Sequence, residues 1–302
     1  MNNSTFNILS FDGGGIRGAL SISLLEKIQN EVTNIVKSSN MISGTSTGSL
    51  IALGLAYGMT PNEISKLYSK ENIEYIFDKS YSQISRPKYD SDNLKEILLS
   101  VFPENLKLKD LGKLVIIPTF YVGDEYNSWK AVFYNNLPDS STEDYRVVDV
   151  AMASSAAPVF FPSYNCNIDG GIIATDPSLA SIIYAIDDEL GKKIHQIRLL
   201  SFGTGYCYNS IKADTSNWGA IDWVISKDPD LPIISLTLEG NSQVSQLFSK
   251  KLLDNNYYRV NPKMDKDVSM DDTKAINYLL KLAEEYDIKE CINWVNSKWN
   301  KI

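Results

Sequence analysis

Short apolar runs alternate with glycine turns and amphipathic segments through the first two hundred residues. The run Phe6–Phe11 predicts a strand, and after Gly18 apolar residues recur at helical spacing as far as Val36. A short strand ending near Ile42 leads into a second glycine turn, and residues 48–57 then predict an apolar helix. Strands that alternate with helices in this way indicate a largely parallel sheet covered on both faces.

The later segments continue the pattern. Thr60, Pro61 and Glu63 form an N-cap, a first-position proline and a third-position acid, so a helix begins there and we expect it to continue through Ile76. Residues 80–93 are polar and predict a long surface loop of the kind that forms lids. The remaining predictions are strands at 114–122 and 129–134, a helix at 147–155, a strand at 166–168, a helix opened by Asp176 and Pro177, a strand at Ile197–Phe202, and two or three helices with a strand at Tyr257–Val260.

The composition argues against several classes of binding partner. The chain has 302 residues, a formal charge of −8 and no broad basic surface for a phosphate backbone, so it predicts no nucleic-acid binding. The charge also argues against simple electrostatic attachment to anionic lipid. The chain has a single histidine, His195, and no plausible set of zinc ligands, so we expect no metal.

Cellular location follows from what the sequence lacks. Cys166, Cys207 and Cys291 are odd in number and widely spaced, which is typical of reduced cytosolic thiols. No signal peptide or anchor is visible, and no stretch approaches about 18 apolar residues. We therefore expect a cytoplasmic protein without a membrane span. No linker or repeat divides the chain, which predicts a single domain over residues 1–302.

The segment GTSTG at residues 44–48 is a G-x-S-x-G between a predicted strand and a predicted helix. A sharp turn at this place projects the Ser46 hydroxyl, and Gly44 and Gly48 let chain and substrate approach closely. The following helix directs its free N–H groups and positive dipole end at the reacting centre. Ser46 is therefore a candidate nucleophile, with a glycine turn that only caps a helix as the structural alternative.

A second glycine loop, DGGGIRG at residues 12–18, also joins a strand to a helix. Gly13, Gly14 and Gly15 expose successive N–H groups, which can form an anion-binding nest and, in an acyl hydrolase, an oxyanion hole. Gly13, Gly15 and Gly18 also match the dinucleotide fingerprint G-x-G-x-x-G. That fingerprint expects an acidic residue about 20 residues later to hold the ribose, and here the second strand runs into the serine turn instead. Nucleotide binding and a purely structural turn remain the alternatives.

Asp169 precedes Gly170 and Gly171 after a short strand. A nucleophilic serine needs a base within hydrogen-bond reach, and a free aspartate with a pKa of about 4 is a weak base in water. Desolvation raises the pKa of a carboxyl group and makes it a better base. By itself, the segment DGG is more often only a turn. Its occurrence together with the two other glycine segments, at residues 12–18 and 44–48, makes Asp169 the candidate base.

His195 offers a Ser–Asp–His triad as the alternative mechanism. It lies just before a predicted buried strand, with more than a hundred residues after it. In α/β-hydrolases the histidine follows a late strand at the catalytic edge of the sheet. We therefore interpret His195 as a structural or surface residue and favour a Ser–Asp dyad.

These motifs, in this order, resemble the patatin-like phospholipase family. The matching segments are DGGGIRG at 12–18, GTSTG at 44–48 and DGG at 169–171, supported by ASSAAPVFFP at 153–162 and SFGTG at 201–205. The resemblance spans residues 6–205, and the combination is far more specific than any single motif. One departure is Asp176-Pro177, where the family usually has Asn-Pro. Aspartate caps a helix about as well as asparagine, so the fold should survive, although an extra carboxylate could alter selectivity.

The resemblance implies a three-layer α/β/α sandwich with a largely parallel central sheet, completed by helices in residues 206–302. It also implies ester hydrolysis on phospholipids or lysophospholipids by a Ser46–Asp169 dyad, without metal or cofactor and with peripheral membrane contact. The amides of Gly13, Gly14 and Gly15 would bind the oxyanion. The residues expected to support the motifs are Arg17, Gly18, Gly44, Gly48, Gly170 and Gly171.

Several alternatives stay open at this point. The apolar stripe Ile288, Ile292, Val295, Trp299 and Ile302 predicts core packing, with an interfacial membrane surface or a dimer contact as the alternatives. Residues 156–164 could line an acyl pocket or only pack beside Asp169. A catalytically silent storage or interaction protein would keep the same motifs. Homo-oligomer formation, activation by a partner or small nucleotide, and acyl-chain, positional and head-group preference are not determined by these residues.

Overall fold

The computed structural model describes residues 5–78, 81, 86–226 and 231–299. Within them lies a seven-stranded sheet of order β4-β3-β2-β1-β6-β7, with β5 paired to β3. The strands are β1 (Phe6–Phe11), β2 (Met41–Gly44), β3 (Leu114–Tyr121), β4 (Lys130–Asn135), β5 (Asn167–Asp169), β6 (Ile197–Phe202) and β7 (Tyr257–Val260). Four neighbouring pairs are parallel, whereas β4 and β5 run antiparallel to β3. The predicted largely parallel sheet is confirmed, and the strands predicted at 114–122 and 129–134 pair as an antiparallel hairpin.

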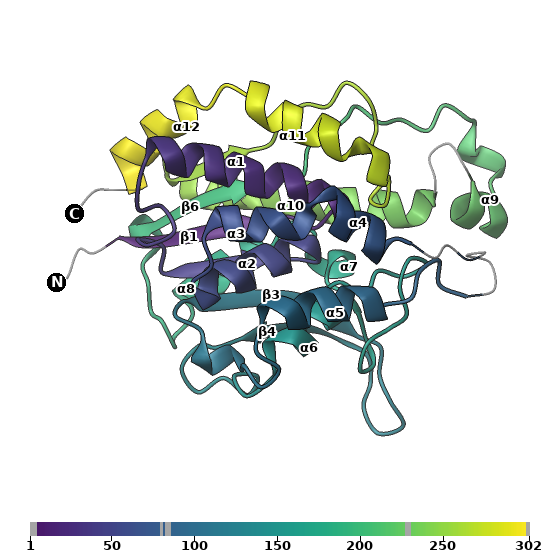
Figure 1. Ribbon diagram of the computed structural model, residues 1–302, viewed down its shortest axis with the longest axis horizontal. Helices are drawn as coiled ribbons and strands as arrows, with labels where there is room; N and C mark the ends of the chain where they lie inside the picture. Colours follow the sequence, from purple (N-terminus) through teal and green to yellow (C-terminus); the bar gives the residue numbers. More distant parts are fainter. Residues whose placement is uncertain (1–4, 79–80, 82–85, 227–230, 300–302) are drawn as a thin grey trace.

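Helices lie on both faces of the sheet and make a three-layer α/β/α arrangement (Figure 1). Both chain ends lie at the left of that view, and α9 lies at the far right. The α-helices are α1 (Gly18–Glu31), α2 (Thr47–Tyr57), α3 (Pro61–Ser65), α4 (Lys70–Ile76), α5 (Asp92–Val101), α6 (Val147–Ser154), α7 (Gly171–Ala174), α8 (Ser178–Ile186), α9 (Ala220–Ile225), α10 (Pro232–Leu253), α11 (Ile276–Glu285) and α12 (Lys289–Trp294).

The sheet carries an apolar core on each face. Successive residues of a strand point to opposite sides. Leu9 and Phe11 of β1 therefore pack with α1, α2 and α11, while Ile8 packs on the other side with Ile182 and Ala185 of α8. Burial on both faces explains why the central strands are continuous apolar runs in the sequence.

Two predicted helix ends are wrong. The first helix ends at Glu31, and the apolar pattern continued to Val36 because Val32 and Ile35 are buried from turns rather than from a helix. The helix predicted from residue 61 to 76 is interrupted after α3 by a 3-10 turn (Lys66–Tyr68). Ser69 is extended there, and its side chain accepts a hydrogen bond from the N–H of Asn72, which starts α4 as a new helix.

The predicted loop at residues 80–93 is confirmed as irregular structure at residues 81 and 86–91, but it is not exposed throughout. Tyr89 is buried and packs against Phe77 and Phe161, and its hydroxyl donates to Asp271 at 2.7 Å. Helix α5 already begins at Asp92. Residues 80 and 82–85 lie outside the described residues. The segment near Tyr89 is therefore part of an aromatic cluster rather than an exposed lid.

The C-terminal stripe packs into the core. Ile288, Val295 and Trp299 are buried in the cluster that also contains α1 and α11, while Ile302 lies outside the described residues. The Trp299 indole N–H donates to Ser38 Oγ at 2.9 Å. Core packing is thus confirmed over the membrane and dimer alternatives for these three side chains.

No helix of the described chain combines the length and apolar character needed to cross a membrane.

Trp299→Ala should lower the free energy of unfolding by about 3–5 kcal/mol, because it removes a large side chain from a packed core and leaves a cavity. Trp129→Ala is the matched control, since Trp129 is 73% exposed whereas Trp299 is 1% exposed. The control should stay within about 0.5 kcal/mol of the parent chain. Urea unfolding followed by circular dichroism measures both. Equal stability of the two variants would contradict a core role for Trp299.

Candidate active site

Ser46 sits on a tight turn between β2 and α2. Its φ of 52° places a non-glycine residue in a region that costs energy and that often marks functional sites. The turn is possible because its flanking residues lack β-carbons. A β-carbon on Gly44 would lie 1.9 Å from the carbonyl oxygen of Gly48, and one on Gly48 would lie 2.3 Å from that of Phe11. The predicted strand–turn–helix context of Ser46 is therefore present, and its side chain is half-buried.

Ser154, at the end of α6, supports this turn. Its hydroxyl accepts a hydrogen bond from the Ser46 N–H at 3.0 Å and donates one to the carbonyl oxygen of Pro118 in β3 at 2.7 Å. Ser154 is fully buried, so these bonds form away from water. The sequence analysis named the segment 153–162, which contains Ser154, but it did not predict this role. Nothing in the local pattern shows which backbone group a buried serine will contact.

Asp169 ends β5 and faces Ser46. The carboxylate is buried, accepts a hydrogen bond from the Gly171 N–H at 2.7 Å, and is in hydrogen-bonding contact with the Ser46 side chain. Burial raises the pKa of Asp169 to about 6, against the opposing effects of Ser46 and of the Gly171 amide. Gly170 lets the loop lie on β3, because a β-carbon there would be 2.1 Å from the Pro118 carbonyl oxygen. Two side chains far apart in sequence thus share one site.

The glycine loop after β1 lies beside Ser46. A β-carbon on Gly13 would be 3.4 Å from the β-carbon of Ser46. One expectation needs correction here. The Gly13 N–H is not free, because it donates to the carbonyl oxygen of Thr175 at 2.9 Å. The amides of Gly14 and Gly15 donate to no acceptor among the described residues, so they remain the candidate oxyanion donors of this loop.

Thr47 is a further candidate for the oxyanion donor, which the sequence analysis did not name. It is the first residue of α2, directly after Ser46, and a helix has no internal acceptor for the N–H groups of its first turn. The general signal was available, since the residue after a nucleophilic serine often supplies an oxyanion N–H.

Arg17 and Gly18 support the first glycine loop, residues 12–18. The Arg17 Nε donates to the carbonyl oxygen of Gly14 at 3.4 Å, a long hydrogen bond, and burial lowers the pKa of Arg17 from its ordinary value. A β-carbon on Gly18 would lie 2.2 Å from the Thr47 hydroxyl, so this glycine lets the start of α1 approach the start of α2.

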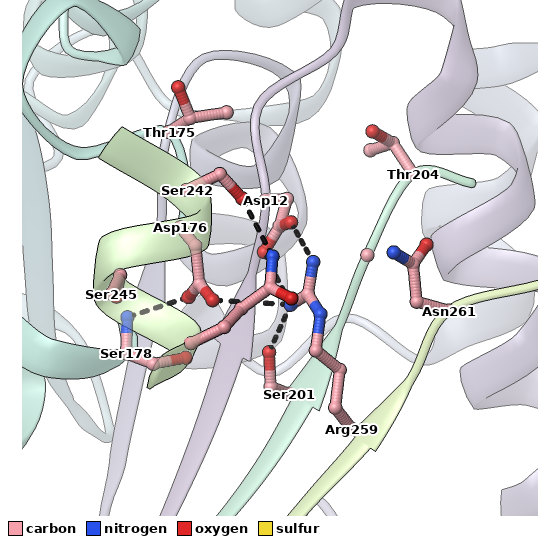
Figure 2. A network of polar contacts seen from close by, with 12 residues as sticks. Asp12, Thr175, Asp176, Ser178, Ser201, Thr204, Ser242, Ser245, Arg259 and Asn261 are labelled. Atoms are coloured by element: carbon pink, nitrogen blue, oxygen red, sulfur yellow. Dashed lines mark hydrogen bonds and ion pairs between the residues drawn. The ribbon is translucent and has the colours of Figure 1, made fainter. Parts of the chain in front are cut away.

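A buried charge network lies beneath the two loops (Figure 2). Arg259 of β7 donates from Nη1 to Asp12 at 3.1 Å, to Asp176 at 3.2 Å and to Ser201 at 2.7 Å. It ties the start of the first glycine loop to the segment that follows the Asp169 loop. Burial raises the pKa of Asp12 to about 7, although the adjacent guanidinium acts in the opposite direction. Nothing in the sequence pattern pointed to Arg259.

The network also accounts for Asp176. Its carboxylate pairs with Arg259, and its other oxygen accepts the Ser178 N–H at 2.9 Å at the start of α8. The N-cap residue of α8 is Pro177 rather than Asp176, so the predicted cap is wrong by one position, although the Asp176 side chain still binds the first N–H of the helix. The carboxylate is directed at Arg259 and α8, so the added charge is compensated by an ion pair.

A narrow apolar cleft opens beside Ser46. Its walls come from α2, α4, α5 and the segment 155–161, which answers the open question about residues 156–164: Ala157, Phe160 and Phe161 line the cleft. Apolar walls with a few polar side chains are the usual construction of a small-molecule site.

His195 lies at the amino-terminal end of β6, whereas Ser46 lies at the carboxyl-terminal end of β2. It is exposed in a 3-10 turn just before β6 begins at Ile197. β6 and β2 both run parallel to β1, and Ser46 follows the carboxyl end of β2. A histidine at the amino end of β6 therefore faces away from Ser46, and the surface interpretation is confirmed.

Comparisons with known proteins identify relatives of this chain. The family model for patatin-like phospholipases matches residues 9–180, more than half of the chain. Protein teg of Priestia megaterium is 29% identical, over 98% of this chain and 99% of that protein. A cGAMP-activated phospholipase of Pseudomonas aeruginosa is 28% identical, over 90% of this chain and 83% of that protein. A solved structure of the ExoU–SpcU complex from Pseudomonas aeruginosa matches at 13% identity with a TM-score of 0.47, over 98% of this chain and 52% of that chain.

Arg259→Met should destabilise the fold by about 3–5 kcal/mol at pH 8, because it leaves the buried carboxylates of Asp12 and Asp176 unpaired. Loss of the guanidinium removes the effect that lowers the Asp12 pKa, so that pKa rises further above its unfolded value. Such a group stabilises the fold while protonated and loses this effect as pH rises through the folded pKa. The defect should therefore shrink at pH 5, as measured by urea unfolding at both pH values. Adding Asp176→Asn should recover part of the loss at pH 8; no recovery would contradict the network.

Proposed function

Because the chain belongs to the patatin-like phospholipase family, we propose that it is a lipid acyl hydrolase that cleaves fatty acyl esters through Ser46 and Asp169. The observation that carries the proposal is the contact between the Ser46 side chain and a buried Asp169 whose pKa is raised to about 6. A carboxylate in this state can accept a proton near neutral pH, which an exposed aspartate does poorly.

In the first step Ser46 Oγ attacks the ester carbonyl carbon, and its proton passes to the Asp169 carboxylate. The carbonyl oxygen becomes an oxyanion, which the N–H groups of Gly14, Gly15 and Thr47 stabilise by hydrogen bonds. Collapse of this intermediate expels the alcohol part of the lipid, which takes the proton from Asp169. The product left on the enzyme is an acyl ester of Ser46.

In the second step a water molecule attacks the acyl ester, and Asp169 accepts the proton of that water. The oxyanion forms again at the same donors and collapses to release the fatty acid, while the proton returns to Ser46 Oγ. One carboxylate thus acts as base and then as acid in each half of the cycle.

The family points to phospholipids or lysophospholipids as the substrates, and the apolar cleft supports this choice. The acyl chain would lie among the apolar side chains that begin at Ser46, with Leu50 of α2 and Leu98 of α5 among them. Burying apolar chain surface contributes about 25 cal/mol per Å², so a long chain gains binding energy that a short one lacks. Short p-nitrophenyl esters should still react, because the chemistry needs only the ester group.

Two observations argue against the alternative functions, nucleotide binding and a catalytically silent storage or interaction protein. A pyrophosphate would find only the Gly14 and Gly15 amides of the first glycine loop available, because the N–H groups of Gly13 and Ile16 donate to Thr175 and Met270. A silent storage or interaction protein would not need a strained serine beside a buried carboxylate, since that strain costs stability.

Ser46→Ala and Asp169→Asn should each lower kcat/KM for p-nitrophenyl butyrate by at least about 10³-fold, because each removes a group used in both steps. His195→Ala is the control and should keep most activity. A fluorophosphonate probe should label the parent chain and not Ser46→Ala. Full activity in either dyad variant, or complete loss in the histidine variant, would remove the basis for the dyad.

The activity should rise with pH through about 6 and level off above it. Asp169 must be ionised to accept the serine proton, and its pKa lies near 6. A histidine base would titrate in a similar range, so the profile of kcat/KM against pH should be measured for the parent chain and for His195→Ala. Both should have the same midpoint; a rate that stays constant from pH 5 to 8 would speak against Asp169.

A further inference from the structure

Helix α9 is apolar yet buries none of its side chains. Ile221, Val224 and Ile225 are 74%, 46% and 49% exposed. Asp222 closes the start of the helix by accepting the Gly219 N–H at 2.9 Å, so this is a formed helix on the outside of the molecule. Isolated exposed apolar residues are ordinary, but a helix that exposes three of six in this way marks an interaction site.

The first turns of α10 extend this apolar surface. α9 packs on α10, whose Ile233 and Leu236 are also exposed. The inner face of α10 is instead made of small polar residues, including Ser242 and Ser245. This helix therefore presents its larger apolar side chains to the outside. We call Ile221, Val224, Ile225, Ile233 and Leu236 the α9 surface.

The α9 surface lies at the substrate end of the molecule. Leu231, just before α10, packs in one cluster with Phe160, which lines the cleft beside Ser46. Asn241 of α10 donates to the carbonyl oxygen of Gly171, two residues after Asp169. In Figure 1, α9 stands at the right, away from both chain termini.

Charge around the α9 surface selects its partner. From residue 213 to residue 249 the sequence has one lysine, Lys227, and no arginine, against five acidic residues: Asp214, Asp222, Asp228, Asp230 and Glu239. An anionic surface would be repelled by these carboxylates and by the net charge of −8. An uncharged apolar phase under neutral head groups would not.

We propose that the α9 surface docks the protein on a zwitterionic lipid bilayer and delivers lipid from it to the cleft beside Ser46. This inference rests on the proposed function for the origin of the substrate. A lipid must leave the bilayer to reach the cleft, and a bilayer under α9 places that route at its surface. A second copy or another protein seated here would cover the same route.

The binding test uses Ser46→Ala protein, which separates docking from turnover. Flotation with phosphatidylcholine vesicles should recover it, and Ile221→Asp with Val224→Asp should reduce the vesicle partition coefficient by about 10-fold or more, since both changes place charge where apolar contact is required. The matched control is Ile183→Asp with Ile186→Asp, two exposed apolar positions on α8, outside the α9 surface. The control should bind as the parent does, and both double variants should keep the parent circular dichroism and melting temperature.

Three results would overturn the proposal. These are unchanged binding in the α9 variant, equal loss in the control, and binding that requires phosphatidylserine. A shift from dimer to monomer caused by the α9 changes, seen by analytical ultracentrifugation, would assign the surface to a second copy instead. With Ser46 restored, the α9 variant should hydrolyse p-nitrophenyl butyrate within twofold of the parent rate while losing about 10-fold on phosphatidylcholine vesicles. If no ester is cleaved at all, the proposed function fails while the binding result still decides the docking.

Discussion

Close contact between backbones at the carboxyl edge of the sheet is the constraint on which the site depends. The would-be β-carbons of Gly44 and Gly170 fall about 2 Å from carbonyl oxygens, closer than any side chain permits. These contacts press the end of β2, the start of α2 and the loop after β5 together. Ser46 and Asp169 meet because three separate turns leave out the atoms that would hold them apart.

The same edge contains energetic costs that the rest of the fold offsets. Ser46 is strained, Asp169 is desolvated, and Asp12 and Asp176 are buried as carboxylates. Each cost is met by a specific contact rather than by general burial. Ser154 holds the strained turn through its hydroxyl, and Arg259 neutralises the carboxylates from a strand late in the chain. Such arrangements concentrate at sites where chemistry needs a group in an unfavourable state.

Apolar surface is distributed according to two different demands. In the sheet, alternating side chains feed a core on each face, and the C-terminal helices close one of them with Trp299. In α10 the small inner face allows close packing, and larger apolar side chains remain outside. The first distribution stabilises the fold. The second leaves apolar surface exposed on α10, and we propose that its first turns, together with α9, recognise lipid.

Local sequence patterns determined the order of strands and helices, the G-x-S-x-G turn and the capped start at Thr60, because these depend on neighbours a few residues apart. They also identified Ser46 and Asp169 as candidate site residues, because both lie next to glycines, and glycine is required where two backbone segments approach closely. Tertiary structure alone decided that the Gly13 amide is occupied by Thr175, that Tyr89 is buried, and that Arg259 joins the two loops. Partners of this kind come from distant segments, and no periodicity records which donor meets which acceptor once the layers close.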